Sequence, residues 1–168
     1  MKKLIAVIGH DQHAKQIHLE TAQEVGKEIA LRGGILICGG NKTGVPNAAA
    51  KGAREGNGLT VGICPGSDLE NVSQFVDIPI LTGMGFARNQ IIAFSADALI
   101  SIGGGVGTFS EMAYGYAYSK PIVAIKELGG LPESFIGKYL DDKKKVKIIG
   151  ANNAKEAVDL AFKLIKQG

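Results

Sequence analysis

The sequence predicts a single α/β domain, in which a doubly wound, mostly parallel sheet carries helices on both faces. Short apolar runs alternate with amphipathic helical stretches along the whole chain, which is the pattern of successive βαβ units. Most of these runs are continuous in apolar residues, as in strands that are covered on both faces. The length of 168 residues fits one domain, and no linker or internal repeat divides it. We therefore expect a Rossmann-like domain over residues 1–168, built from right-handed crossovers.

Seven apolar runs are expected to form strands: Leu4–Ile8, Ile35–Cys38, Leu59–Cys64, Phe75–Leu81, Ala98–Ile102, Ile122–Ile125 and Val146–Ile149. Helices are expected between them, over 15–32, 46–56, 86–95, 108–118 and 153–166, with a short one near 134–140. The first helix ends at Gly33-Gly34, because glycine adopts the left-handed conformation of a helix C-cap at little cost.

The composition excludes several classes of protein. A net charge of +3 is too small to indicate a polyanionic partner, and 6% aromatic residues without tryptophan argue against a base-stacking surface, so nucleic acid is not expected as a partner. Cys38 and Cys64 lack a second cysteine or a histidine at metal-ligand spacing, so no metal site is predicted and a reducing compartment fits best. No run approaches the ~20 apolar residues that span a bilayer. We expect a soluble protein of the cytoplasm.

Glycine-rich turns follow most of the expected strands. In open α/β sheets ligands bind beyond the carboxyl ends of the strands, and glycine there lets backbone N–H groups approach an anion. One such turn is typical of any tight strand-to-helix connection, but several at one edge favour a phosphate-bearing ligand. The candidate ligand-binding glycines are Gly9, Gly39, Gly40, Gly104, Gly105 and Gly107.

The segment Gly103–Glu111 carries the strongest signal. It follows a buried strand and opens a helix, so its free N–H groups can hold a phosphate, to which Thr108 can add its hydroxyl. It is neither a P-loop nor a GxGxxG fingerprint. Glu111 has two interpretations: a chemical role, or a capping box with Thr108 three residues earlier. The spacing alone favours the capping box.

Three further groups of residues have open interpretations. Arg88 lies near the start of an expected helix, where a cation opposes the helix dipole, so a role on an anionic ligand is as well supported as a solvated position. The cluster of His10, Asp11 and His13 is better explained as a polar helix entry than as a metal pair. Tyr114 and Tyr118, which share a helix face, indicate core or dimer packing.

Several segments resemble the Lonely-Guy-like superfamily of Rossmann-type proteins, whose members often carry the misleading label "lysine decarboxylase". They are Arg88-Asn89, Ser95–Ala98, Gly103–Glu111 and Lys120-Pro121, with looser matches at Gly39-Gly40 and over 44–53. The best-understood members are nucleoside 5'-monophosphate phosphoribohydrolases, which split the N-glycosidic bond of cytokinin nucleotides. The most similar branch looks like the one that contains molybdenum-cofactor carrier proteins and relatives of DNA-processing protein A.

The resemblance assigns roles residue by residue. It places the catalytic arginine of the family on Arg88 and the catalytic glutamate on Glu111. The phosphate loop of the family falls on Gly104, Gly105, Gly107 and Thr108. The chain departs from the hydrolases in three places: Gly103 replaces a proline, Asn89 replaces a lysine, and the first loop reads Gly-His-Asp-Gln-His. Nucleotide or phosphate binding therefore transfers better than the hydrolase activity.

The resemblance leaves three functions open. The first is a phosphate-anchored binding protein or carrier, with a nucleotide or the molybdenum cofactor as its small ligand and no obligatory cofactor. The second is a phosphoribohydrolase, and the third, disfavoured by charge and aromatic content, is single-stranded DNA binding. Lysine decarboxylation is rejected, because the sequence has no Ser-x-His-Lys-type lysine for pyridoxal phosphate. The resemblance also implies a homo-oligomer, at least a dimer.

Overall fold

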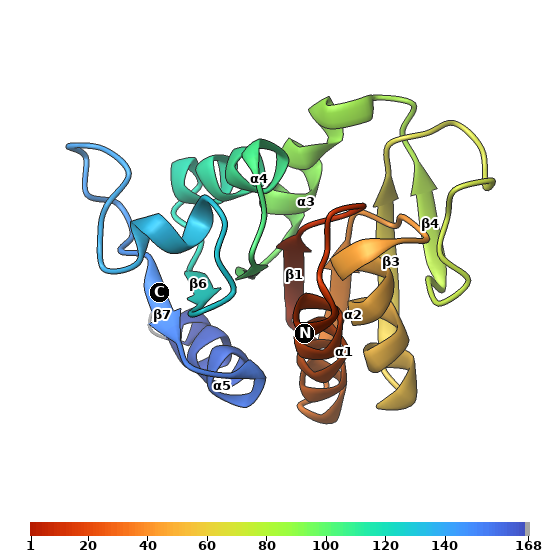
Figure 1. The fold of residues 1–168 in the computed structure, drawn as a ribbon, viewed down its shortest axis with the longest axis horizontal. Helices are drawn as coiled ribbons and strands as arrows, with labels where there is room; N and C mark the ends of the chain where they lie inside the picture. The colour runs from red at the N-terminus through yellow and green to blue at the C-terminus, as the bar shows by residue number, and fades with distance from the viewer. Residues whose placement is uncertain (167–168) are drawn as a thin grey trace.

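A computed structural model of the protein describes residues 1–166 and contains a seven-stranded parallel sheet (Figure 1). The strands lie in the order β4-β3-β2-β1-β5-β6-β7. Their bounds are β1 Leu4–Gly9, β2 Ile35–Cys38, β3 Leu59–Cys64, β4 Ile78–Leu81, β5 Ala98–Ile102, β6 Ile122–Ile125 and β7 Ile149–Ala151. The helices are α1 Gln16–Leu31, α2 Gly44–Glu55, α3 Asn89–Ser95, α4 Val106–Ala117 and α5 Ala154–Ile165, with 3-10 helices η1 Gly85–Arg88 and η2 Pro132–Phe135.

The chain builds the sheet outward in two directions from β1. It runs from β1 to the edge strand β4, then crosses back to place β5 on the other side of β1 and continues to β7. The carboxyl ends of β1 and β5 therefore diverge into loops that leave in opposite directions. Such a reversal of strand order is where open α/β sheets bind their ligands.

Helices cover both faces of the sheet, as the sequence predicts. Alternation along β1 shows the two layers: Ile5 and Val7 pack against α1, α2 and α5, whereas Ala6 and Ile8 pack against α3 and α4. The backbones of α1 and α2 are in contact at Gly52. A Cβ at this position would lie only 1.8 Å from the Gln23 carbonyl oxygen of α1. Glycine at this position is a packing requirement.

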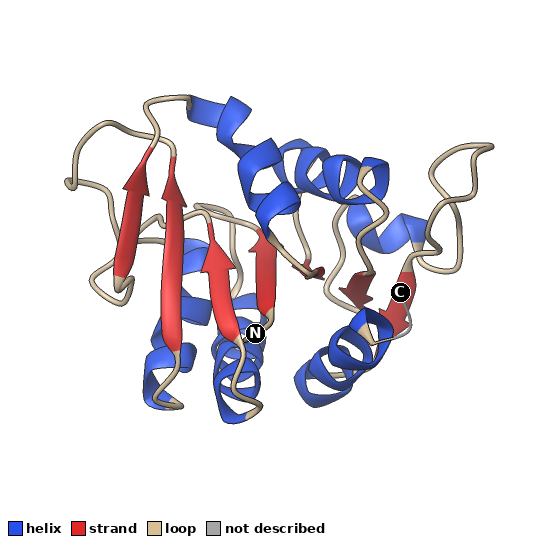
Figure 2. Cartoon of the chain, turned by 180° about the vertical axis from the view of Figure 1, so that it is seen from behind, coloured by secondary structure: helices blue, strands red, loops and turns tan. Residues whose placement is uncertain are grey.

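Four strands, β2, β3, β5 and β6, have the bounds that the apolar runs predict. The prediction for the fourth run was wrong at its start, since β4 begins at Ile78. The Asp77 carboxylate accepts hydrogen bonds from the Thr60 amide and hydroxyl, which holds the preceding residues in a turn. The prediction that the strands are covered also fails for β4, whose four residues are exposed at the sheet edge, on the right in Figure 1 and on the left in Figure 2.

The last strand also differs from its prediction. β7 starts at Ile149 and pairs with β6. It does not start earlier because the Ile148 backbone bonds to the preceding loop. The Ile148 amide donates to the Lys138 carbonyl, and the Ile148 carbonyl accepts from the Gly137 amide. The predicted helix over 86–95 is divided into η1 and α3, and α4 begins two residues earlier than expected. Within the described residues, no helix is long and apolar enough to cross a membrane.

Candidate functional site

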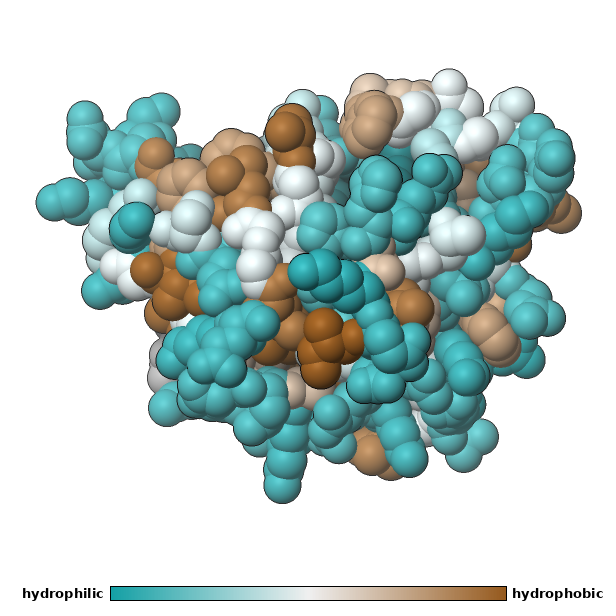
Figure 3. Space-filling view, viewed as in Figure 1, coloured by the Kyte–Doolittle hydropathy of each residue, from teal (hydrophilic) through white to brown (hydrophobic). Residues whose placement is uncertain are grey.

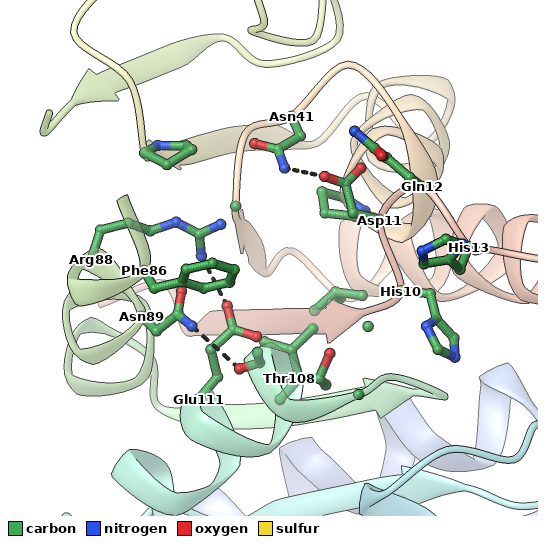
Figure 4. A pocket seen from close by; sticks show the side chains of 18 of the residues that line it. His10, Asp11, Gln12, His13, Asn41, Phe86, Arg88, Asn89, Thr108 and Glu111 are labelled. Carbon is green, nitrogen blue, oxygen red and sulfur yellow. Dashed lines mark hydrogen bonds and ion pairs between the residues drawn. The ribbon is translucent and has the colours of Figure 1, made fainter. Parts of the chain in front are cut away.

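A pocket of about 520 Å³ opens at the carboxyl edge of the sheet, at the junction of β1 and β5 (Figure 4). Its volume falls within the range of about 300–1,000 Å³ that is usual for small-molecule sites. The loop after β1 forms one side, and η1, α3 and the first turns of α4 form the other. The pocket therefore lies where the order of the strands predicts a ligand.

Most of the predicted site residues line this pocket. They are Gly9, Gly39, Arg88, Gly105, Gly107, Thr108 and Glu111. Gly40 and Gly104, both with positive φ, are not among the described residues that line it. A Cβ on Gly40 would meet the Cys64 sulfur at 2.5 Å, and one on Gly104 would meet the Thr108 hydroxyl oxygen at 2.3 Å. These two glycines shape the turns behind the wall of the pocket.

Arg88 and Glu111 form an ion pair in the wall of the pocket. The Arg88 Nη1 donates to Glu111 Oε1 at 3.0 Å, and the two side chains are only 11% and 9% exposed (Figure 4). The guanidinium lies against Gly39, where a Cβ would come within 2.7 Å of Nη2. The interpretation of Arg88 as a residue on a solvated face is therefore wrong, and Gly39 is needed to make room for it.

The capping interpretation of Glu111 is also wrong. The N-cap of α4 is Gly105, so Thr108 is the third residue of the helix and Glu111 the sixth. At that position Glu111 lies beyond the first turn, and its carboxylate bonds to Arg88 instead of the cap amide. The spacing suggested a cap because the helix was expected to begin at residue 108, whereas it begins at Val106.

Burial makes the Glu111 carboxyl a weaker acid than usual. Loss of hydration raises the pKa of its carboxyl from 4.5 to about 7, although the charge and hydrogen bond of Arg88 act in the opposite direction. A carboxyl group with this pKa is present in both protonation states at neutral pH, which suits a general acid or base.

The first turn of α4 offers an anion site. Gly105, Val106 and Gly107 begin the helix, where amide groups have no carbonyl of a preceding turn to bond. Gly105 is open to the pocket, because no described atom lies within 4 Å of the place where its Cβ would be. Free amides and the positive end of the helix dipole together favour a phosphate at this position.

The polar loop after β1 forms the opposite side of the pocket. The Asp11 carboxylate accepts hydrogen bonds from the Asn41 amide nitrogen, at 2.6 Å, and from the Thr43 hydroxyl. The His10 ring stacks on His18 with centroids 5.1 Å apart, and burial, followed by nearby positive charges, lowers the pKa of His10. Residues 1–166 contain no group of three histidine, cysteine or acidic side chains placed to hold a metal ion.

The pocket is also lined by residues that the sequence did not indicate as site residues. Asn41, Phe86 and Asn89 are among them. Asn41 follows the turn after β2, and the other two flank Arg88 within two positions. The available signal was that these residues are close in sequence to predicted site residues. Asparagine and phenylalanine are uncharged, however, and the sequence alone does not distinguish a ligand contact from a packing role for them.

Residues 2–158 match the model of the SLOG cluster4 family. The chain belongs to the SLOG cluster4 family. Among its relatives, an uncharacterized protein of Archaeoglobus fulgidus is 46% identical over 73% of this chain and 79% of that protein. A cytokinin riboside 5'-monophosphate phosphoribohydrolase of Mycobacterium tuberculosis is 37% identical over 66% of this chain. The match spans 64% of that enzyme's length.

Solved structures extend the comparison to the whole chain. The molybdenum cofactor carrier protein of Chlamydomonas reinhardtii superposes with a TM-score of 0.86 at 36% identity, covering 100% of both chains. DNA processing protein A of Helicobacter pylori has a TM-score of 0.70 at 17% identity over 98% of this chain and 81% of that one, a likeness of fold alone. The predicted resemblance and the predicted fold are confirmed.

Proposed function

We propose that this pocket binds a phosphate-bearing nucleotide or nucleotide-like ligand, with the phosphate against the first turn of α4. The observation that carries this proposal is the open backbone of Gly105, at the start of α4, in a pocket that Arg88 also lines. Amides, a helix N-terminus and an arginine are the groups that hold phosphates in proteins. The hydroxyl of Thr108, which also lines the pocket, adds a further donor.

Similarity over the whole chain supports a carrier role. The carrier protein of Chlamydomonas is 36% identical to this chain and covers 100% of it. The molybdenum cofactor would then be cargo. Its phosphate would bind at α4, and its polar pterin would extend toward the loop after β1, where His10 and Asn41 offer hydrogen-bonding groups. No resident cofactor is part of this proposal.

A second candidate, N-glycosidic hydrolysis of a nucleoside 5'-monophosphate, is favoured by Glu111. In this reaction the bond from C1' to the base breaks, the oxygen of water bonds to C1', and the base leaves with a proton. The ionised Glu111 carboxylate would stabilise the oxocarbenium-like transition state and orient the water. Arg88 would hold the phosphate or the sugar hydroxyls, so that binding energy fixes the reacting carbon.

Two measurements test these functions. Native mass spectrometry of freshly purified protein would show a retained ligand by its mass, and we expect a phosphate-bearing compound. Incubation with a panel of nucleoside 5'-monophosphates, followed by chromatography, would show released base. Binding without base release supports the carrier role, and release by the wild type supports the hydrolase.

We further propose a homo-oligomer, at least a dimer, that works in the cytoplasm. Apolar and aromatic side chains are exposed on α3 and α4, and Figure 3 shows hydrophobic residues at the surface over α4, in its upper part. Those of Phe94, Val106, Tyr114 and Tyr118 are exposed, and Phe94 and Tyr118 meet edge to face with centroids 4.8 Å apart. Exposed apolar surface of this kind is found at protein interfaces. The buried free thiols of Cys38 and Cys64 fit a reducing compartment.

A further inference from the structure

The amide side chain of Asn89 is buried in the wall of the pocket with half of its hydrogen-bonding capacity unused. Asn89 is 2% exposed and begins α3, directly after Arg88. Its Nδ2 donates to the Gly107 carbonyl at 3.2 Å and to the Ser110 hydroxyl at 2.7 Å. Within residues 1–166, its Oδ1 is buried and has no hydrogen-bond partner.

The orientation of this amide follows from its neighbours. The Gly107 carbonyl can only accept, so the atom that faces it must be the nitrogen of Asn89. The Ser110 hydroxyl gives its own proton to the same carbonyl at 2.6 Å, which leaves its lone pairs for the Asn89 nitrogen. Both contacts therefore require the amide nitrogen on this side and turn Oδ1 away from α4.

A second buried polar atom lies on the preceding residue. Arg88 Nε has no hydrogen-bond partner among the described residues, although its Nη1 bonds to Glu111. Consecutive residues of the pocket wall thus present one unused donor and one unused acceptor. Buried polar groups are rarely left in this condition, and a ligand that bonds to them would remove the cost.

A sugar hydroxyl has the chemistry that these two atoms require. A hydroxyl group donates one hydrogen bond and accepts two, so it can serve Asn89 Oδ1 and Arg88 Nε alike. The location agrees, because the Asn89 amide is bonded to Gly107 in the first turn of α4, where the phosphate is proposed to lie. In a nucleoside 5'-monophosphate the group bonded directly to the phosphate is the sugar.

We propose that Asn89 is a specificity-determining residue, whose Oδ1 accepts a hydrogen bond from a ribose hydroxyl of the ligand and so selects ribonucleotides over deoxyribonucleotides. The proposal rests on the proposed nucleotide binding at α4.

The side chain of Phe86 is placed to open this subsite. Its ring edge reaches Gly107, where a Cβ would lie 3.2 Å from Cε1, and the residue is 81% exposed. Little packing therefore holds the ring. It stands on η1 after two glycines, Gly83 and Gly85, both with positive φ. In Figure 4 the Phe86 ring lies beside Arg88 and Asn89, so its rotation would widen this side of the pocket without a change in the fold.

The test compares adenosine 5'-monophosphate with its 2'-deoxy and 3'-deoxy forms by calorimetric titration. Removing the hydroxyl that Asn89 accepts should leave Oδ1 buried without a partner, so we expect one deoxy form to bind about tenfold more weakly to the wild type. In Asn89→Leu the ribonucleotide should lose that advantage, and the ratio should fall to about one. Asn89→Ser, a smaller change, provides the same comparison if the leucine variant does not fold.

Ser110→Ala is the matched control. It removes one of the two bonds of the Asn89 nitrogen and keeps the Gly107 carbonyl, so Oδ1 stays in place and the ribose preference should persist. If Asn89 were only structural, Ser110→Ala and Asn89→Leu would leave the same preference. Equal binding of all three nucleotides to the wild type would overturn the role of Asn89 but not the proposed nucleotide binding. Failure of all four common ribonucleoside 5'-monophosphates to bind would overturn both.

Discussion

The guanidinium of Arg88, at the end of η1, and the carboxylate of Glu111, in the second turn of α4, lie 3.0 Å apart in the wall of the pocket. The pair joins the two segments that flank the proposed phosphate site. Taking both charges out of water costs about as much as their attraction returns, so such a pair is weak evidence of a stabilising role. Its position beside the first turn of α4 is consistent with the proposed role in ligand binding.

The raised pKa of Glu111 predicts a pH-dependent stability. Because its pKa is about 7 in the folded protein and 4.5 ordinarily, the folded state binds more protons between these values. The stabilising contribution is complete below about pH 4.5 and is lost as the pH rises through 7, in total about 3 kcal/mol at about 1.4 kcal/mol per pH unit.

Glu111→Gln isolates this contribution, since glutamine resembles the protonated carboxyl and its oxygen can still accept from Arg88. We expect the variant and the wild type to have similar free energies of unfolding at pH 5, and the variant to be about 2–3 kcal/mol more stable at pH 8. Urea denaturation at four pH values between 5 and 8 measures the difference. Parallel curves for the two proteins would show that Glu111 titrates normally.

The sequence predicted the fold better than it predicted the site. The strands β2, β3, β5 and β6 are largely buried, so each is a short apolar run that can be recognised from the sequence alone. The start of β4 depends instead on the hydrogen bond between Thr60 and Asp77, which are 17 residues apart. The residues of the pocket came from glycines and from the resemblance. The pairing of Arg88 with Glu111 was not predicted, because it depends on where α4 begins and on the packing of α3 against α4.

Gly105→Val tests the position of the phosphate. No described atom lies within 4 Å of the position of its Cβ, so the added side chain meets no clash in the folded protein, and circular dichroism checks that the variant keeps its fold. Its side chain would project where the phosphate approaches the backbone, and nucleotide affinity should fall below detection. Gly66→Val is the control, because Gly66 is equally open and is not among the described residues that line the pocket. Unchanged affinity of Gly105→Val in calorimetric titration would remove the phosphate from this turn.

Phe94→Asp tests the proposed dimer. The Phe94 ring lies on the exposed apolar surface of α3, in contact with Tyr118 and 5.8 Å from the Lys120 ammonium. A carboxylate there would replace the apolar ring by a charge that an interface would strip of water, so we expect the wild type to sediment as a dimer or larger species and the variant as a monomer. Sedimentation equilibrium at micromolar concentration is the measurement, with circular dichroism as the check that the variant is folded. A monomeric wild type would contradict the interface.

Base release by the wild type and by Glu111→Gln decides whether the Glu111 carboxylate has a chemical role. If it stabilises positive charge on the ribose, only its ionised form acts, so the rate should rise with pH and level off above an apparent pKa of about 7. Glu111→Gln should lower the rate about 10²–10⁴-fold and remove this pH dependence, while nucleotide affinity survives, because the amides of α4 and Arg88 remain. The measurement is initial rates of base release between pH 5 and 9, with affinity determined separately by calorimetry. Release that persists in Glu111→Gln would exclude Glu111 from the mechanism, and binding without release in the wild type would leave the carrier role as the function of the pocket.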